Sequence, residues 1–400
     1  MRSLSLTILI MFFSALGSHA QVSNFATIDK NTYDLYKIEK WDLLIDQVNH
    51  AIKIGYDYYY LRMRIGIAYF EKEQYRSAIP HFKKALTFSK NPIAAEYLYY
   101  AYKLSGRQMD ANLVYSKYKD QLISKDVQNP LSFFTGFYSE LGLKTLSPSN
   151  SEYGSLFNTH IGVEQQLGSR INLYQGYTRI SQNFYSYETL SGFGGRYFIN
   201  KSTFKYSQNE YYLRATIPVT NGLQLTGGLH TQAISDSVSY NNLSYWLGIK
   251  ANLKSIDFNL SYGKSIIESS HHDQYTGDLI IYPSKNLNMY LRSMLTYHLA
   301  NDISNTIFYQ KIGLRTGENT WFEFYGSFGN MQNVQELEGF YIYNLKNYMN
   351  KRLGFSIIFL IKEKSKLIFG YTNESFEEID TGLPFNQNYF FTGFNLKLKN

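Results

Sequence analysis

Residues 243–253 of the chain read LSYWLGIKANL, and after Lys254 and Ser255 residues 256–263 read IDFNLSYG. In both segments every second residue is apolar, and most of the residues between them are polar or small. Side chains of a β-strand point alternately to opposite faces, so each segment has one apolar wall and one polar wall. The two-residue link has the length and composition of a tight turn, which predicts an antiparallel hairpin.

The same alternation recurs along the last two-thirds of the chain, in segments rich in Tyr and Phe. We place the predicted strands at residues 132–144, 156–167, 170–181, 209–219, 223–234, 241–253, 256–267, 275–283, 288–299, 305–316, 320–329, 348–361, 366–374 and 388–399. A series of such segments, each about ten residues long, is typical of a transmembrane antiparallel β-barrel. We therefore expect residues 130–400 to form a barrel of about 14 strands, with 12 or 16 as the alternatives.

The gaps between the predicted strands are alternately short and long. The short gaps are at 168–169, 220–222, 254–255, 284–286, 316–319 and 362–364, and the long ones are at 145–155, 182–208, 330–347 and 375–387. Outer-membrane barrels have short periplasmic turns and long outer loops. Both ends of the barrel are therefore expected to face the periplasm, which requires an even number of strands.

The first twenty residues have the composition of a secretory signal peptide. Arg2 gives a charged start, residues 6–13 are apolar, and Ser18, His19 and Ala20 form a small-residue cleavage site before Gln21. This apolar segment is too short to span a bilayer, and no later segment offers the roughly 18 consecutive apolar residues of a spanning helix. We therefore expect residues 1–20 to be removed and any membrane insertion to occur through strands.

Composition narrows the class of protein further. The 400 residues include no cysteine, which excludes a disulfide framework and a thiolate metal site. The 38 Tyr and 28 Phe favour a membrane protein, since Tyr prefers the interface between lipid and water, although a secreted soluble β-protein rich in Tyr is the alternative. The formal charge of +7 is scattered along the chain, so no nucleic-acid partner is expected.

Residues 25–126 differ from the rest, because their apolar residues recur at helical spacing and the pattern repeats after 33 to 34 positions. Small and aromatic residues at these spacings are predicted to pack one helix on the next. They are Trp41, Leu44, Ala51, Gly66, Tyr69, Ala78, Phe82, Ala85, Tyr102 and Ala111, with Val48, Tyr75, Tyr115 and Tyr118 in the same register.

This pattern resembles three tetratricopeptide repeats, a family that holds a peptide or partner domain on its concave face. Tyr99 and Tyr118 occupy positions where the family prefers small residues, and Pro80 lies inside a predicted helix, where it is expected to bend or delay it. A helical bundle without repeats is the alternative.

Charged residues in the predicted strands should point into the lumen, because a charge on the lipid face costs about 2 to 4 kcal/mol at the midplane. By parity, the candidates are Glu164, Arg214, His230, Lys250, Asp257, Lys264, Arg292, Glu323 and Lys397. Their mixed signs argue against a strongly ion-selective pore. The lumen is expected either to be an open channel or to be closed by side-chain pairs and a folded-in loop such as 182–208.

No cluster in the sequence predicts catalysis, a cofactor or a metal site. Residues 269–273 read SSHHD, but a serine hydrolase triad joins residues from distant segments, and these residue types are common in turns. A flexible outer loop is predicted to contain the acidic residues Glu374, Glu377, Glu378 and Asp380. The alternative is that these residues bind a divalent cation. Gly192, Gly194 and Gly195 precede no predicted helix and form no phosphate cradle.

The domain order resembles that of polysaccharide exporters, and also that of the YaiO-like family of repeat-bearing barrels. These resemblances imply a non-enzymatic protein of the Gram-negative outer membrane, with outer-membrane lipid around the barrel and the helical domain in the periplasm. Its expected role is transport or export, with a polysaccharide as one candidate cargo, or envelope assembly, and the helices would bind a periplasmic protein. The alternatives are a non-conducting scaffold that recruits such a partner and a hydrolase at the outer rim.

Overall fold

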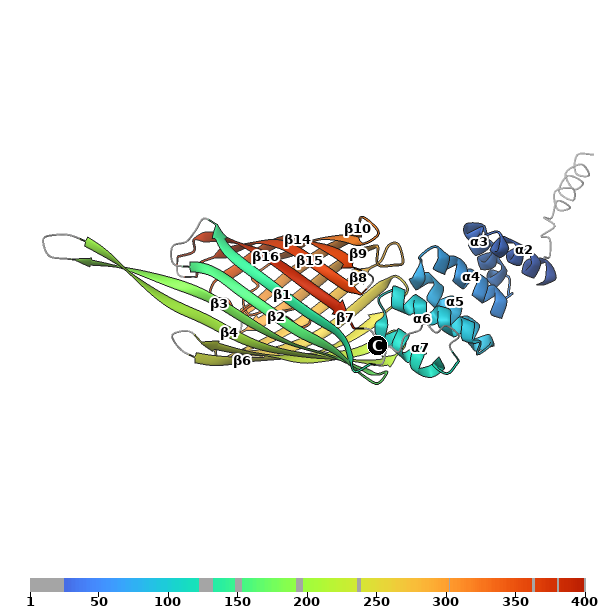
Figure 1. Cartoon of the computed structure of the whole chain (residues 1–400), viewed down its shortest axis with the longest axis horizontal. Coiled ribbons are helices and arrows are strands. Elements are labelled where there is room, and N and C mark those ends of the chain that lie inside the picture. Colours follow the sequence, from blue (N-terminus) through green and yellow to red (C-terminus); the bar gives the residue numbers. More distant parts are fainter. Residues whose placement is uncertain are drawn as a thin grey trace, which may run out of the picture.

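The computed structural model describes residues 25–121, 132–147, 153–191, 197–235, 239–301, 303–361, 364–379 and 381–398. The predicted signal peptide and the three glycines at 192, 194 and 195 lie outside these residues. The described part of the chain forms a helical domain followed by a β-barrel (Figure 1).

Six helices follow one another in the helical domain. They are α2 (Phe25–Lys37), α3 (Trp41–Lys53), α4 (Tyr59–Glu71), α5 (Tyr75–Phe88), α6 (Pro92–Leu104) and α7 (Gln108–Tyr118). The start of α6 is encoded locally, since the side chain of Asn91 accepts a hydrogen bond from the Ile93 amide and Pro92 occupies the first turn. Pro80 neither begins nor ends α5, which continues to Phe88.

The helices are held together by two apolar clusters. One is built around Leu44, Val48, Leu61 and Ile65, and the other joins α4, α5, α6 and α7 around Phe82. Seven of the ten predicted packing residues are buried in these clusters: Leu44, Ala51, Ala78, Phe82, Ala85, Tyr102 and Ala111. Trp41 and Tyr69 pack against the clusters, and Gly66 is buried beside the Phe82 ring. The positions selected from the sequence are therefore core positions.

Fourteen antiparallel strands close into a barrel. They are β1 (Phe134–Ser147), β2 (Tyr153–Leu167), β3 (Ile171–Ser191), β4 (Tyr197–Thr220), β5 (Leu223–Ser235), β6 (Ser239–Asn252), β7 (Ile256–Ile267), β8 (Ser270–Ile281), β9 (Met289–Ala300), β10 (Ile303–Arg315), β11 (Thr320–Phe328), β14 (Tyr348–Ile361), β15 (Ser365–Glu377) and β16 (Pro384–Lys397). Each strand pairs with its neighbours in sequence, and β16 returns to pair with β1. The predicted fold class and strand number are confirmed.

Exposure alternates along the strands, as the sequence pattern predicts. In β6 the side chains of Leu243, Leu247 and Ile249 are exposed, whereas Ser244 and Trp246 are buried. Apolar residues thus cover the outside of the barrel and polar residues line its inside, which is the architecture of outer-membrane barrels. In the described part of the chain, no helix has the length and apolar character needed to cross a bilayer.

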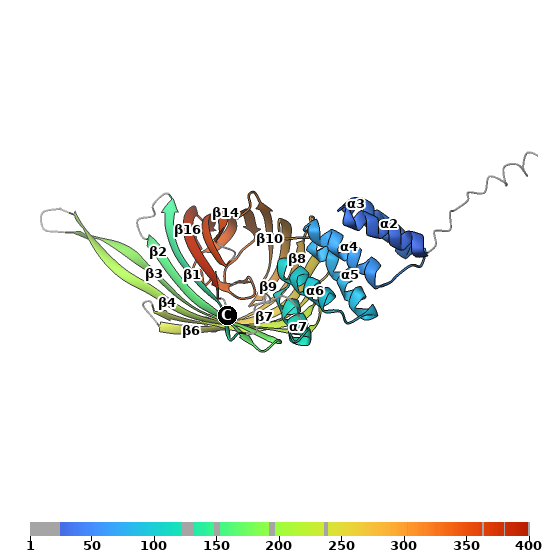
Figure 2. The same cartoon turned by 45° about the vertical axis from the view of Figure 1, so that its right-hand side comes forward.

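The helical domain lies at the end of the barrel where β16 ends (Figures 1 and 2). At the opposite end β3 and β4 project well beyond their neighbours, and they remain paired to each other out to Ser191 and Tyr197. The suggestion that the 182–208 segment folds into the lumen is therefore wrong, because residues 182–191 pair with residues 197–206 in this long hairpin. A different segment fills the lumen.

Candidate functional site

Residues 329–347, which connect β11 to β14, fold back into the barrel, and we call this segment the plug. It carries a short antiparallel ladder of β12 (Gln335–Glu336) and β13 (Tyr341–Ile342). The turn between them has positive φ at Leu337, Glu338 and Gly339. Side chains of β12 and of the turn bond to the barrel wall, and the Tyr341 hydroxyl of β13 donates to Glu140 of β1 at 3.4 Å, so the plug occupies the lumen.

The base of the plug is held by a buried ion pair. One guanidinium nitrogen of Arg352, on β14, lies 2.7 Å from both carboxylate oxygens of Glu336. Tyr343 donates its hydroxyl to the same carboxylate at 2.9 Å and also contacts Arg352. Ion pairs this deep are expensive to break from one side only, so Arg352 and Glu336 fix the plug in one position.

The tip of the plug is held by polar contacts to β4 and β5. Arg214 pairs with the Glu338 carboxylate at 3.3 Å, and the Tyr212 hydroxyl donates to the Glu338 carbonyl at 2.9 Å. His230 Nδ1 lies 2.7 Å from the Gly339 carbonyl oxygen. A Cβ added at Gly339 would approach the Trp246 ring to 2.8 Å, so the tip also rests directly against Trp246.

Further contacts join the plug to other parts of the wall. Gln335 bonds to Gln274 through its backbone and to Ser265 through its side chain, at 2.7 to 2.9 Å. The Phe340 ring packs against His160 and Tyr212, with centroids 4.9 and 5.3 Å apart. The plug is therefore anchored on opposite sides of the barrel by hydrogen bonds and charges, and Met331 and Val334 also pack in a buried apolar cluster with Ile307, Met349 and Phe376 of the wall.

On the side of the plug away from the helical domain, a large cavity lies within the barrel, and we call it the outer cavity. Its volume is about 1170 Å³. Aromatic rings and side-chain amides dominate its lining, among them Tyr185, Tyr206, Tyr341, Tyr343, Tyr389, Asn158, Gln182, Gln208, Asn344 and Gln387. Lys144 and Glu374 form an ion pair at 2.6 Å in its wall.

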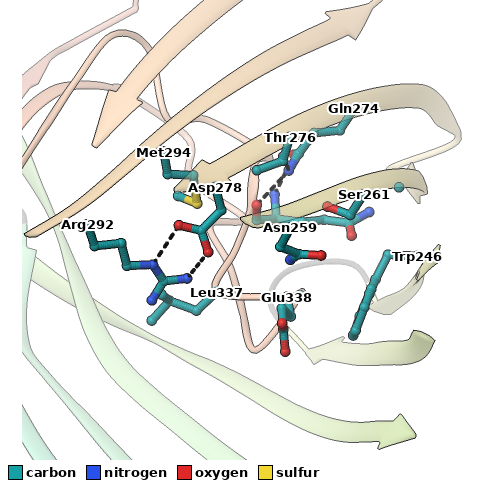
Figure 3. A pocket seen from close by; sticks show the side chains of 13 residues that line it. Trp246, Asn259, Ser261, Gln274, Thr276, Asp278, Arg292, Met294, Leu337 and Glu338 are labelled. Atoms are coloured by element: carbon teal, nitrogen blue, oxygen red, sulfur yellow. Dashed lines mark hydrogen bonds and ion pairs between the residues drawn. The ribbon is translucent and has the colours of Figure 1, made fainter. Parts of the chain in front are cut away.

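On the other side of the plug tip lies a smaller, charged cavity of about 230 Å³, the lower cavity. It is lined by Arg214, Lys250, Asp257, Asn259, Asp278, Arg292, Leu337 and Glu338, with Phe258 and Ile280. Figure 3 shows the adjoining space between the plug and the wall, where Arg292 binds both oxygens of Asp278 at 2.8 and 2.9 Å and Glu338 lies close by. The lower cavity thus separates the plug tip from the rim that carries the helical domain.

Most of the residues predicted to face the lumen lie there. Seven of them make contacts or line cavities inside the barrel: Glu164, Arg214, His230, Lys250, Asp257, Arg292 and Glu323. Lys397 lies at the rim, and its position in β16 has the same parity as the inward-facing Tyr389.

The prediction for Lys264 is wrong. Its neighbours Gly263 and Ser265 contact the plug residue Gln335, whereas Tyr262 and Ile266 are exposed on the outside. Because side chains alternate, Lys264 lies on the outer face, next to Asp273 of β8 in the strand register.

The residue clusters weighed for chemistry do not assemble into a site. Ser269 lies in the tight turn between β7 and β8, and His271 and His272 point to opposite faces of β8. His272 stacks on His298, with 3.2 Å between ring nitrogens. The prediction of a flexible outer loop is wrong for Glu374 and Glu377, which belong to β15: Glu374 pairs with Lys144 inside the barrel, and Glu377 bonds to Asn350. Asp380 lies outside the described residues. Among the described residues, no group of three or more His, Asp or Glu side chains could hold a metal ion.

The helical domain is docked on the rim of the barrel through a buried arginine. Arg76, at the start of α5, binds both carboxylate oxygens of Asp257 at 2.8 and 2.9 Å, and its guanidinium lies 3.7 Å from the centre of the Tyr282 ring. The Arg76 amide also donates to the Lys285 carbonyl. The Arg76 side chain is only 1% exposed, so this contact is enclosed by both domains.

A second docking contact involves the turn between β4 and β5. Asp110 of α7 accepts a hydrogen bond from the Gly222 amide at 2.7 Å. Gly222 has a φ of +92°, and a Cβ there would lie 3.0 Å from Arg107, so glycine suits both the turn and the close approach of the helix. The sequence predicted no docking role for Arg76 or Asp110, since nothing in a periodic pattern links positions so far apart.

Comparisons with known proteins identify no family for this chain. No family model and no curated protein matches it. Solved structures with a similar fold include the Ralstonia pickettii toluene transporter TbuX, at 10% identity and a TM-score of 0.46, covering 66% of this chain and 90% of that one. The P. putida toluene transporter TodX has 8% identity and a TM-score of 0.43, covering 73% of this chain and 94% of that one.

A structure described as a bacterial polysaccharide outer membrane secretin is also similar, at 9% identity and a TM-score of 0.37, covering 66% of this chain and 99% of that one. With identities and scores this low, the assignment of the fold rests on the strand pairing of the chain itself. The resemblances to tetratricopeptide repeats and to the YaiO-like family stay predictions.

Proposed function

We propose that this protein is a gated outer-membrane transporter whose resting lumen is closed by the plug. The observation that carries the proposal is the chemistry of the plug's attachment. Glu336, Glu338 and the Gly339 carbonyl bind polar groups of the wall, and such groups can be hydrated when they separate, unlike the faces of an apolar core. The tip of the plug, from Gln335 to Gly339, can therefore leave the wall without exposing a large apolar surface, while Met331 and Val334 stay packed against Ile307, Met349 and Phe376.

The outer cavity supports a carbohydrate as the class of cargo. Its lining combines tyrosine rings with side-chain amides of Asn and Gln, which can stack on sugar rings and bond to hydroxyl groups. A pocket for an apolar cargo would be expected to carry mainly aliphatic side chains and few convergent polar groups. Cargo passing the plug would move between this cavity and the lower cavity.

The helical domain supports a role for a periplasmic partner. It sits on the rim formed by the short turns of the barrel, which in outer-membrane barrels face the periplasm. Stacked helical repeats offer an extended concave surface for a protein or peptide. We propose that this domain brings a periplasmic protein, such as an enzyme that makes or modifies the cargo, to the mouth of the channel.

Conductance in planar bilayers tests the proposal. The intact protein should be closed for most of the time, whereas a variant in which a short Gly-Ser linker replaces residues 331–346 should conduct steadily. A plug tied to the wall by a thiol crosslinker between Ser265→Cys and Gln335→Cys should not open, and the natural chain contains no competing cysteine. A folded, plugless barrel that carries no current would contradict the proposal.

A non-conducting scaffold is the second candidate, and the enclosed Arg76 contact favours it, because a rigidly docked helical domain suits a fixed platform. Crosslinking of the intact protein in whole cells, followed by detergent extraction, separates the two. A scaffold requires a stable partner of the helical domain and no current from the plugless variant. A transporter requires the current, whether or not a partner is captured.

A further inference from the structure

The lower cavity has one cation without a carboxylate partner. Its lining carries three cations, Arg214, Lys250 and Arg292, and three carboxylates, Asp257, Asp278 and Glu338, and Arg76 reaches Asp257 from the helical domain. Each carboxylate already has a cation: Asp257 pairs with Arg76, Asp278 with Arg292, and Glu338 with Arg214. Within the described residues, Lys250 has no ion-pair partner inside 4.0 Å, so one positive charge faces the cavity unbalanced.

Arg214 also keeps hydrogen-bonding capacity. Its Nε is buried without a hydrogen-bond partner, and a single nitrogen contacts Glu338 at 3.3 Å. By contrast, Arg292 binds Asp278 through two nitrogens at 2.8 and 2.9 Å. A guanidinium group binds carboxylate or phosphate best through two parallel N–H donors. Of the arginines that line this cavity, Arg214 is therefore the one whose pairing is less complete.

We propose that the lower cavity binds an oxyanion, a carboxylate or phosphate group of an acidic cargo, through Arg214 and Lys250, and that this binding releases the plug. The inference rests on the proposed function and narrows it to an acidic cargo that opens its own channel. The oxyanion competes with Glu338 for Arg214. Because Arg214 is free to bind the oxyanion when the plug is released but not when Glu338 is seated on it, cargo shifts the population toward the open state.

Trp246 offers a readout that does not depend on conductance, since it touches the plug tip at Gly339. The full-length protein in detergent, with Trp41→Phe and Trp321→Phe, leaves Trp246 as the only tryptophan of the three. Its emission is titrated with trigalacturonate, with inorganic phosphate, and with maltotriose as a neutral sugar of the same length. A correct barrel is verified for every variant by its altered migration on unheated gels.

The expected result is a saturable change of Trp246 emission with trigalacturonate, with phosphate or with both, and none with maltotriose. A response to trigalacturonate alone indicates a carboxylate on a sugar, and a response to phosphate alone indicates a phosphate-bearing cargo. Arg214→Gln and Lys250→Gln should each weaken binding at least tenfold, and Arg214→Lys should weaken it less than Arg214→Gln. Glu338→Gln should strengthen binding, because it removes the competing carboxylate.

Lys264→Gln is the matched control, because it removes the same charge from the outer face of the neighbouring strand, and it should bind as the parent does. The inference is overturned if maltotriose acts as strongly as trigalacturonate, if neither anion changes the emission, or if Arg214→Gln and Lys250→Gln bind normally. A plugless barrel that conducts while Trp246 stays silent defeats this inference alone. If Trp246 responds to an anion but the plugless barrel carries no current, the proposed transport is wrong and the anion site still stands.

Discussion

Arg76 and Asp257 are 181 residues apart in the chain, and their side chains form a two-pronged ion pair that joins the helical domain to the barrel. The pair is enclosed, with 1% and 7% of the two side chains exposed. Asp257 also lines the lower cavity. The Asp257 carboxylate therefore belongs both to the docking contact and to the lumen. A movement of the helical domain and a charge that enters the lumen would both act on this carboxylate.

Replacing Arg76 should release the helical domain from the rim. Removing one partner of a buried ion pair typically costs about 3 to 5 kcal/mol, because the other charge stays buried and unpaired. We expect Arg76→Ala to undock the helices and Arg76→Lys, which cannot bind both oxygens, to undock them partly. The measurement is crosslinking between Glu73→Cys and Asn288→Cys, whose parent side chains lie 3.1 Å apart across the interface. Arg62→Ala, which breaks an ion pair with Asp57 inside the helical domain, should leave that crosslink intact.

Breaking the ion pair at the base of the plug should open the lumen. Arg352 has Glu336 as its carboxylate partner, so Arg352→Ala or Glu336→Ala is expected to destabilise the closed state by about 3 kcal/mol or more. Since 1.4 kcal/mol is a factor of ten, the ratio of open to closed channels should rise roughly 100-fold. Single-channel recording in planar bilayers measures the ratio directly.

The control for this prediction is an ion pair of the lumen that does not touch the plug. Lys311 and Glu323 pair at 2.9 Å between neighbouring strands of the wall. Lys311→Gln should change conductance only in a channel that is already open. If it opens the closed channel as often as Arg352→Ala does, general damage to the lumen, and not release of the plug, explains the current.

The barrel could be predicted almost completely from the sequence, because alternation has a period of two and a hydrocarbon surface outside the barrel enforces it. All fourteen predicted segments fall on observed strands. The plug could not be placed this way, since a two-residue ladder in a 19-residue connection carries no periodic signal. One clue was present: residues 340–343 read FYIY, which is unusually apolar for a loop expected to lie in water.

The candidate site was predictable only in its parts. Parity placed Arg214 and His230 inside the barrel, but their partners Glu338 and the Gly339 carbonyl lie on the plug. Lys264 shows the limit of the preference for inward charges, because it shares the parity of the outward-facing Phe258, Leu260 and Tyr262. Near the end of a strand, a lysine can remain outside, beside Asp273.

Close packing of α4 on α5 depends on Gly66. A Cβ at this position would lie 2.6 Å from the Phe82 ring, so Gly66→Ala should destabilise the helical domain by about 1 to 3 kcal/mol through overpacking. Thermal unfolding of the full-length protein, followed by circular dichroism at the helical minimum, measures the loss. Combining Gly66→Ala with Phe82→Leu should restore part of it, and absence of any rescue would argue against the clash as the cause.

Stability of the helical domain should fall in mild acid because of His81. Burial, with Arg62 3.2 Å away and Lys254 nearby, lowers the pKa of His81 from 6.5 to about 4. Above pH 6.5 neither the folded nor the unfolded chain binds this proton. Between pH 6.5 and about 4 only the unfolded chain does, so stability decreases as the pH falls, by on the order of 3 kcal/mol. His81→Asn should flatten the melting temperature of the helices across this range, while an unchanged slope would exclude His81 as the cause.

A charge on the outside of the barrel tests whether lipid surrounds it. Leu247, in the middle of β6, is 70% exposed, and Leu43, on α3, is 56% exposed, so water would treat the two leucines alike. If hydrocarbon covers the barrel, Leu247→Arg should destabilise it by about 2 to 4 kcal/mol, whereas Leu43→Arg should have little effect. Refolding yield into phosphatidylcholine vesicles across a urea series distinguishes them. Equal behaviour of the two variants would mean that the apolar wall of the barrel does not face lipid, and the membrane assignment would fail with it.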